Sequence, residues 1–189
     1  DRRDALAELL ESRLATIEDP EARVSLEVQL GRALAEMGDV ARAREVLKAA
    51  LDVRPDHREA LFTVADIYVK EGAHEEAESA YVALSRLSLS SAESVRVFDA
   101  LATLYAGPLG NLGRAEVALQ EVLKHAPDDV ATLEKLVAVY RRRNDVPRAV
   151  EVKQQVVGLA KTPEDRLARL VELSQIHETT GRDPRKAEP

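Results

Sequence analysis

Residues 38–68 read GDVARAREVLKAALDVRPDHREALFTVADIY, and residues 110–140, which begin 72 positions later, read GNLGRAEVALQEVLKHAPDDVATLEKLVAVY. Nine positions are identical in the two stretches, and in the first they are Gly38, Arg42, Ala43, Leu47, Leu51, Pro55, Asp56, Leu61 and Tyr68. Similarity at one fixed offset is the signature of a repeat array, in which each unit buries its apolar face against its neighbours. The chain is therefore expected to be a solenoid.

Apolar residues within the repeat follow the period of a helix. Leu61, Val64, Ala65 and Tyr68 fall at i, i+3, i+4 and i+7, which places them on one helical face. A second helix follows, and its small residue recurs at spacings of 34, 38 and 34 residues as Ala43, Ala77, Ala115 and Ala149. Only eight Gly and eight Pro interrupt a chain rich in Ala, Leu and Glu, which favour helices. We therefore predict an all-α fold.

Capping residues set the expected helix boundaries. N-cap positions hold side chains that can accept a hydrogen bond from a first-turn N–H group, namely Asp39, Asp56, Asn111 and Asp145. Expected helix ends, where a left-handed backbone is common, hold Gly38, Gly72 and Gly110. We predict helices near residues 3–18, 21–37, 40–53, 57–71, 74–88, 91–106, 112–125, 129–143, 146–160 and 163–180, with an eleventh beginning near residue 184.

Composition excludes several classes of function. The net charge of −7 is unsuited to nonspecific nucleic-acid binding, which needs a basic face. The absence of Cys excludes disulfides and thiolate metal ligands, and it fits a reducing compartment such as the cytoplasm. A membrane-spanning helix needs a run of about 18 or more apolar residues, and the sequence contains no such run. Arg outnumbers Lys, a bias typical of GC-rich bacterial genomes.

The repeats resemble tetratricopeptide repeats, in which a helix–turn–helix recurs every 34 residues. The matching positions in the first two full units are Leu30-Gly31, Leu34, Gly38, Ala43, Leu47, Ala50 and Pro55, then Val64-Ala65, Tyr68, Gly72, Ala77 and Tyr81. In the next two they are Leu101-Ala102, Tyr105, Gly110, Ala115, Leu119 and Pro127, then Leu136, Tyr140 and Ala149. The resemblance implies a right-handed superhelical solenoid of antiparallel helix pairs, whose first helices line a concave face.

The same resemblance divides the chain into repeats. The expected units are the second helix of a preceding repeat at 1–19, repeats at 20–56, 57–90, 91–128 and 129–162, and a truncated repeat at 163–189. Both ends fall inside a repeat and residue 1 is Asp, so we expect a fragment of a longer array. Leu170 and Leu173 would then lie uncovered, and weak end-to-end self-association is expected.

One departure from the family's pattern affects the core. Lys153 stands where the second helix of the fourth repeat needs a large apolar residue. A lysine at such a position can keep its ammonium in water by extending its stem along the apolar surface. We therefore expect the Lys153 side chain to reach solvent.

The expected concave face supplies the candidate partner-binding residues, which are Arg32, Phe62, Asp66, Thr103, Glu134 and Arg141. Phe62 lies off the core stripe, so it is either a partly exposed anchor for a partner or a residue that packs on a neighbouring helix. The cluster 141–143 is three consecutive Arg, which would either meet an acidic peptide or complement a helix C-terminus.

No catalytic motif is present in the sequence. There is no Gly-rich phosphate loop, no nucleophile elbow and no pair of His four residues apart. His57, His74 and His125 lie near expected helix ends, and His177 takes a packing position on its helix. We predict no catalytic residue, no metal ligand and no cofactor.

Three hypotheses for function follow. The first is a non-catalytic scaffold that holds a peptide or helix of a partner protein in its concave groove. The second is a regulatory or substrate-docking array of a larger enzyme, such as a kinase or a transferase, whose catalytic domain lies outside this sequence. The third is a structural array that drives self-assembly. The sequence identifies no partner for any of them.

Overall fold

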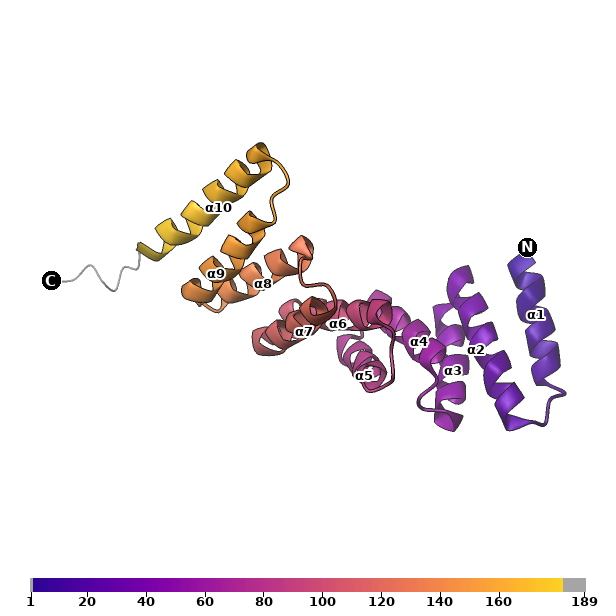
Figure 1. The fold of residues 1–189 in the computed structure, drawn as a ribbon. Coiled ribbons are helices and arrows are strands. Elements are labelled where there is room, and N and C mark those ends of the chain that lie inside the picture. The colour runs from indigo at the N-terminus through magenta and orange to yellow at the C-terminus, as the bar shows by residue number, and fades with distance from the viewer. Residues whose placement is uncertain (1, 182–189) are drawn as a thin grey trace. The chain divides into compact units, whose positions relative to one another are not determined.

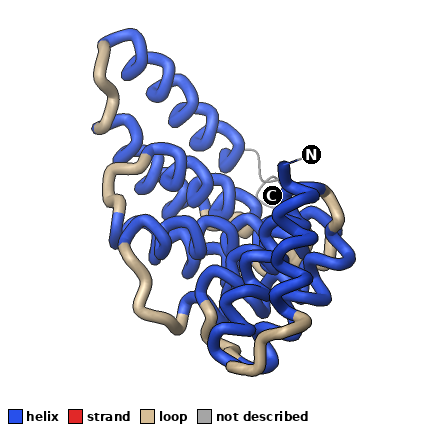
Figure 2. Tube along the Cα trace, turned by 90° about the vertical axis from the view of Figure 1, so that its right-hand side faces the viewer, coloured by secondary structure: helices blue, strands red, loops and turns tan. Residues whose placement is uncertain are grey.

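The computed structural model describes residues 2–181, and these residues form ten α-helices (Figure 1). The helices are α1 (Arg2–Leu14), α2 (Pro20–Met37), α3 (Val40–Val53), α4 (Arg58–Glu71), α5 (His74–Ser85), α6 (Ser91–Ala106), α7 (Leu112–His125), α8 (Val130–Arg142), α9 (Val146–Gly158) and α10 (Pro163–Gly181). Between residues 2 and 181 only turns and loops connect them, without a strand (Figure 2). The predicted all-α class is confirmed, and the eleventh helix expected near residue 184 lies outside the described residues.

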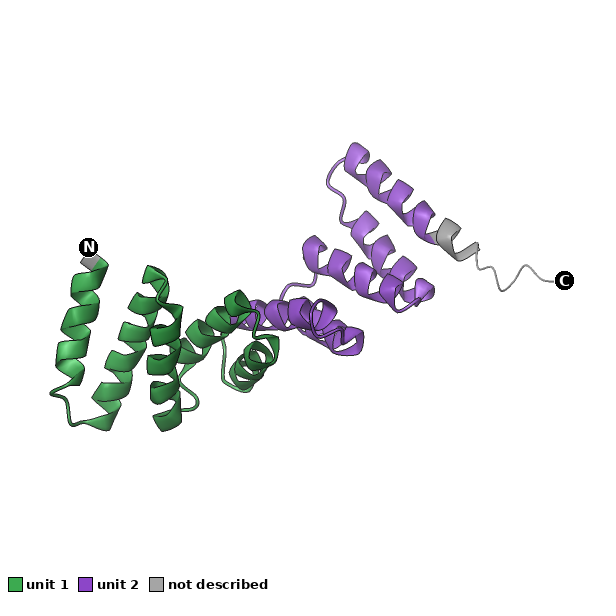
Figure 3. Ribbon diagram, turned by 180° about the vertical axis from the view of Figure 1, so that it is seen from behind, with its two compact units in different colours: residues 1–90 green, residues 91–189 purple. Residues whose placement is uncertain are grey.

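The helices fall into two compact units (Figure 3). Unit 1, residues 1–90, holds α1 to α5, and unit 2, residues 91–189, holds α6 to α10. Within each unit every helix packs against the next one along the chain, and in unit 1 α2 also packs against α4. Packing between sequence neighbours is what a stacked repeat requires, because no single helix pair can bury its own apolar stripe. Of the helices just given, none is both long and apolar enough to cross a lipid bilayer.

Three of the four predicted N-caps are confirmed. The side chains of Asp39, Asn111 and Asp145 each accept a hydrogen bond from the backbone N–H three residues later. The prediction for α4 was wrong, because its N-cap is His57 rather than Asp56, and His57 Nδ1 accepts from the N–H of Ala60 at 3.3 Å. The acceptor must stand three residues before the donor, and Asp56 comes one residue too early.

Two helices end at least three residues earlier than predicted. We expected the first to run to residue 18, but α1 ends at Leu14, and α5 ends at Ser85 rather than at residue 88. Pro20 opens α2 and holds the preceding Asp19 in an extended conformation, with φ −71° and ψ 119°. The chain therefore needs the residues after Leu14 to reverse its direction.

One position of the repeat adopts a left-handed backbone each time it occurs. Gly38, Gly72 and Gly110 have φ values of 86°, 73° and 62°, and each stands directly before the N-cap of a second helix. Asn144 takes the same position before α9, with φ 58°, and is the one non-Gly residue of positive φ within residues 2–181. Asn tolerates this conformation better than other residues with a side chain.

Small residues let the paired helices approach closely. Ala43, Ala77, Ala115 and Ala149, the recurring small residues of the second helices, are fully buried. Gly31 of α2 faces Leu47 of α3, and a Cβ atom placed on Gly31 would lie 2.5 Å from Leu47 Cγ. The rest of the core is mostly aliphatic, and its buried aromatic residues are Phe62, Tyr81, Tyr105 and Tyr140.

The expectation that Lys153 reaches solvent was wrong. Its side chain is only 3 % exposed, and its ammonium donates to Glu134 Oε1 of α8 at 2.6 Å and to Glu172 Oε2 of α10. Burial alone lowers the pKa of a lysine, but the two hydrogen-bonded carboxylates outweigh that effect and raise the pKa of Lys153 above its ordinary value. Two ion pairs therefore take the place of solvent, and they connect α9 to both of its neighbours.

Candidate partner-binding surface

In unit 1 the predicted candidates are all engaged within the chain. Arg32 pairs with Glu59 across α2 and α4. Asp66 Oδ1 accepts a hydrogen bond from the Tyr81 hydroxyl of α5 at 2.9 Å. Phe62 is buried at 9 % exposure, so of its two predicted alternatives the partly exposed anchor is wrong and packing on a neighbouring helix holds.

The three candidates of unit 2 differ in their surroundings. Glu134 is one of the two carboxylates that bind Lys153. The Thr103 hydroxyl donates to the backbone carbonyl of Asp99 at 2.9 Å, which is a contact within α6. Arg141 is exposed and has no ion pair to any residue of the described part of the chain. Of the six predicted residues, Arg141 is thus the most available for an external ligand.

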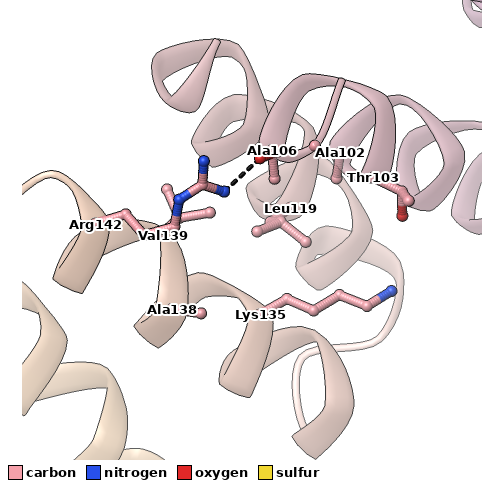
Figure 4. Close-up of a pocket in the computed structure, with 9 residues that line it drawn as sticks. Ala102, Thr103, Ala106, Leu119, Lys135, Ala138, Val139 and Arg142 are labelled. Carbon is pink, nitrogen blue, oxygen red and sulfur yellow. Dashed lines mark hydrogen bonds between the residues drawn. The ribbon is translucent and has the colours of Figure 1, made fainter. Parts of the chain in front are cut away.

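Unit 2 contains a largely apolar pocket between α6, α7 and α8, with a volume of about 340 Å³ (Figure 4). We call it the α6–α8 pocket. The residues that line it are Ala102, Thr103, Ala106, Gly107, Leu119, Lys135, Ala138, Val139 and Arg142. It forms because four of these residues are Ala or Gly, which leave space between helices that larger side chains would fill.

Two cations border the α6–α8 pocket. Figure 4 shows Arg142 and Lys135 on opposite sides of Leu119 and Ala138 in that view. Arg142 Nη1 donates to the carbonyl oxygen of Ala106, the last residue of α6, and Lys135 pairs with Asp99. A guanidinium has five N–H donors, so one such bond leaves Arg142 with donors for a ligand. The pocket therefore combines an apolar interior with a cationic border.

A smaller hollow of about 220 Å³ occurs at the same repeat position in unit 1, between α2 and α4. Alignment of the repeats pairs each residue of this hollow with one of those that line the α6–α8 pocket, and Ala102 and Leu119 of the pocket have no counterpart among them. The residues of the unit 1 hollow are Arg32, Ala35, Glu36, Thr63, Asp66, Ile67 and Lys70. Charged residues in unit 1 replace small ones in unit 2, since Asp66 aligns with Ala138 and Glu36 with Gly107. A hollow therefore occurs at the same repeat position in both units, but its lining is more charged in unit 1 and more apolar in unit 2.

The basic cluster 141–143 combines three different roles. Arg142 complements the C-terminus of α6, and Arg143 pairs with Glu116 of α7. Glu116 also accepts from Arg148 and from the Tyr140 hydroxyl, both at 3.0 Å, so this carboxylate ties together α7, α8 and α9. Only Arg141 stays uncommitted, because helical spacing turns consecutive side chains to different faces.

Sequence reasoning missed Lys135, and it considered Arg142 only as part of the basic cluster 141–143. Both lie on the helix face of Ala138 and Val139, and aligning them with Thr63 and Lys70 would have placed them at the hollow. Within the described residues no cluster of His, Asp and Glu is suited to hold a metal ion. The side chain of His177 lies outside the described residues.

Comparisons with known proteins place these observations in context. Two models of the tetratricopeptide repeat match the chain, at residues 28–88 and 132–167, which together make up about half of it. A search of curated protein sequences finds no match.

Solved structures with the same fold include MamA AMB-1, which is 18 % identical, with a TM-score of 0.67 over 87 % of this chain and 94 % of that one. MamA 41-end from Desulfovibrio magneticus RS-1 is 22 % identical, with a TM-score of 0.57 over 84 % and 95 %. YrrB, described as a TPR protein with an unusual peptide-binding site, is 15 % identical, with a TM-score of 0.61 over 80 % and 84 %. At these identities the likeness concerns the fold.

Proposed function

Because the chain belongs to the tetratricopeptide repeat family, whose members are generally non-catalytic protein-interaction modules, we propose that it holds a peptide or helix of a partner protein in a groove lined by its first helices. The groove would be formed by α2 and α4 in unit 1 and by α6 and α8 in unit 2. The solved structure of YrrB, described as a TPR protein with an unusual peptide-binding site, supports peptide binding as the mode of action.

The single observation that carries the proposal is the recurrence of a hollow between first helices at the same repeat position in each unit. A ligand site is typically concave, mostly apolar and supplied with a few polar groups that fix orientation, and the α6–α8 pocket has these properties. We also propose the repeat boundaries expected from the sequence, with the first helices on the concave side of a right-handed superhelix. Arg141 and the residues of the α6–α8 pocket then replace Phe62 as the contact residues of first choice.

Site-specific photo-crosslinking in a cell lysate tests the face that is used. A photoreactive amino acid placed at Arg141 of α8 should yield a crosslinked protein that mass spectrometry identifies. The same amino acid at Val117, which is 57 % exposed on the second helix α7, should yield none. Adducts at Val117 and none at Arg141 would show that partners use the other face of the repeat.

A further inference from the structure

We propose that the α6–α8 pocket receives one large apolar side chain of a partner segment whose neighbouring residues are acidic. This inference rests on the proposed function and specifies the chemistry of the partner in unit 2. It depends on three observations, which are the apolar lining of the pocket, the sign of the charges at its border and the contrast with the equivalent hollow of unit 1.

The size and lining of the pocket select an apolar group. Leu119 forms part of the wall together with Val139, and small residues leave the space beside them open. An engineered apolar cavity of about 150 Å³ in another protein binds benzene, so a volume of about 340 Å³ accommodates an aromatic or branched aliphatic side chain together with its backbone. A polar side chain would lose its hydration here without gaining a partner from the alanines.

The charges at the border select acidic neighbours. The charged residues that line the pocket are Lys135 and Arg142, both cations, in a chain whose net charge is −7. Arg141 adds a third cation within one helical turn of Ala138 on α8. The nearby carboxylates already have partners, since Asp99 pairs with Lys135 and Glu134 with Lys153. A carboxylate of the ligand would be bound by the donors that Arg142 retains.

The hollow of unit 1 shows what the same backbone does with other side chains. Asp66 occupies the place of Ala138 there, and Arg32 that of Thr103. The unit 1 hollow is smaller, and its border carries both signs of charge. The substitution Ala138→Asp would therefore give unit 2 the unit 1 residue at this position. Because Ala138 is exposed and the equivalent site already holds an aspartate, this variant is expected to fold.

Selection of random short peptides by phage display tests the inference before any partner has been identified. The chain is immobilised as wild type, as Ala138→Asp and as Ala131→Asp. Ala131 is exposed in the first turn of the same helix and does not line the pocket, so it controls for the added charge. We expect wild type and Ala131→Asp to enrich peptides with one large apolar residue flanked by Asp or Glu, and Ala138→Asp to lose them.

The affinity of one enriched peptide, measured by fluorescence anisotropy, then tests each part of the site. Ala138→Asp should weaken binding by about tenfold or more, since changes of one small group in an apolar pocket have effects of this order. Arg142→Ala should weaken it as well, and the loss should shrink as salt is added. Asp99→Asn should strengthen binding, because it frees Lys135 from its ion pair.

The outcomes separate this inference from the proposed function. Enriched peptides without acidic neighbours, or equal enrichment on Ala138→Asp, would overturn the inference and leave the proposed function standing. An absence of any enriched peptide would also overturn it, while crosslinking at Arg141 judges the proposed function independently. If wild type forms dimers in sedimentation and Ala138→Asp abolishes them, the occupant is a second copy of this chain and the inference is wrong.

Discussion

At the scale of single residues, Gly31 lies at a close contact between α2 and α3. We predict that Gly31→Ala destabilises the chain by about 1–3 kcal/mol, because a Cβ atom would lie 2.5 Å from Leu47 Cγ and force the helices apart. Gly158→Ala is the matched control, since no atom lies within 4 Å of a Cβ at that position of α9. Alanine favours a helix over glycine, so the control should stabilise the chain by up to about 1 kcal/mol. Urea unfolding measures both changes, and equal effects would disprove the close contact.

At the scale of elements, the N-cap residue of α8, Asp129, makes the stability of the fold depend on pH in the acidic range. The hydrogen bond from the Thr132 hydroxyl is the largest influence on Asp129 and, with backbone N–H donors, lowers the pKa of its carboxyl below the ordinary 3.8. A lowered pKa stabilises the fold above pH 3.8, and this contribution disappears as the pH falls through the folded value. Asp129→Asn keeps an acceptor but cannot titrate. Its urea midpoint should therefore fall less than that of wild type between pH 5 and pH 3, and parallel curves would contradict this prediction.

Lys153 of α9 forms ion pairs with Glu134 of α8 and Glu172 of α10, and the loss of stability should depend on which charge is removed. Glu134 and Glu172 are 39 % and 57 % exposed, so Lys153→Met leaves two carboxylates that water can solvate. The double variant Glu134→Gln and Glu172→Gln leaves a buried ammonium without a carboxylate, which typically costs about 3–5 kcal/mol. We predict that Lys153→Met changes the free energy of unfolding by much less than the double variant does. The opposite order would show that the ammonium itself is the stabilising group.

The raised pKa of Lys153 predicts how the stability of the fold changes at alkaline pH. Its contribution to stability is complete below the ordinary value of 10.5 and is lost as the pH rises through the higher folded value. The wild type should therefore lose stability at alkaline pH relative to Lys153→Met. The midpoints of urea unfolding of both proteins, measured at increasing alkaline pH, give this difference in stability.

Helices and their order could be predicted from the sequence because each helix has a periodic apolar stripe and most have a capping residue. The positions of Ala43, Ala77, Ala115 and Ala149 indicated the pairing, and the structure buries all four. The surroundings of single side chains could not be predicted in the same way. Phe62 and Glu134 occupy aligned positions, yet the former is buried and the latter reaches across to Lys153. The burial and the partners of such a side chain depend on residues of a neighbouring helix, and the apolar periodicity of its own helix carries no information about them.

The α6–α8 pocket illustrates the same limit at the candidate site. It exists because Ala106 of α6 and Ala138 of α8, 32 positions apart in the sequence, are both small. Each alanine alone is an ordinary helix former. Their coincidence opens a hollow only once the two helices are placed side by side on α7, so it is a property of the assembled unit.

At the scale of the whole molecule, exposed apolar residues gather on α1 and on α10. Leu6 and Leu9 are 46 % and 56 % exposed on α1, and Leu167, Leu170 and Val171 are exposed on α10. Leu173 is half-buried and Ile176 buried, so the expected stripe of α10 is covered only in part. Helix faces of this kind pack against a further helix in a repeat array. We predict that α10 of one copy packs weakly on α1 of another.

Because the two faces differ, this contact is heterologous and need not close, so it should give a concentration-dependent series of oligomers rather than one dimer. Sedimentation velocity should show the mean mass rising with concentration. Leu170→Glu should abolish the rise, and Val117→Glu, which places the same charge on exposed α7, should not. Leu9→Glu should also give monomers, but a mixture of Leu9→Glu with Leu170→Glu retains one intact face on each protein and should stop at a heterodimer. A wild type that stays monomeric at high concentration, or a mixture that forms longer species, would refute end-to-end packing.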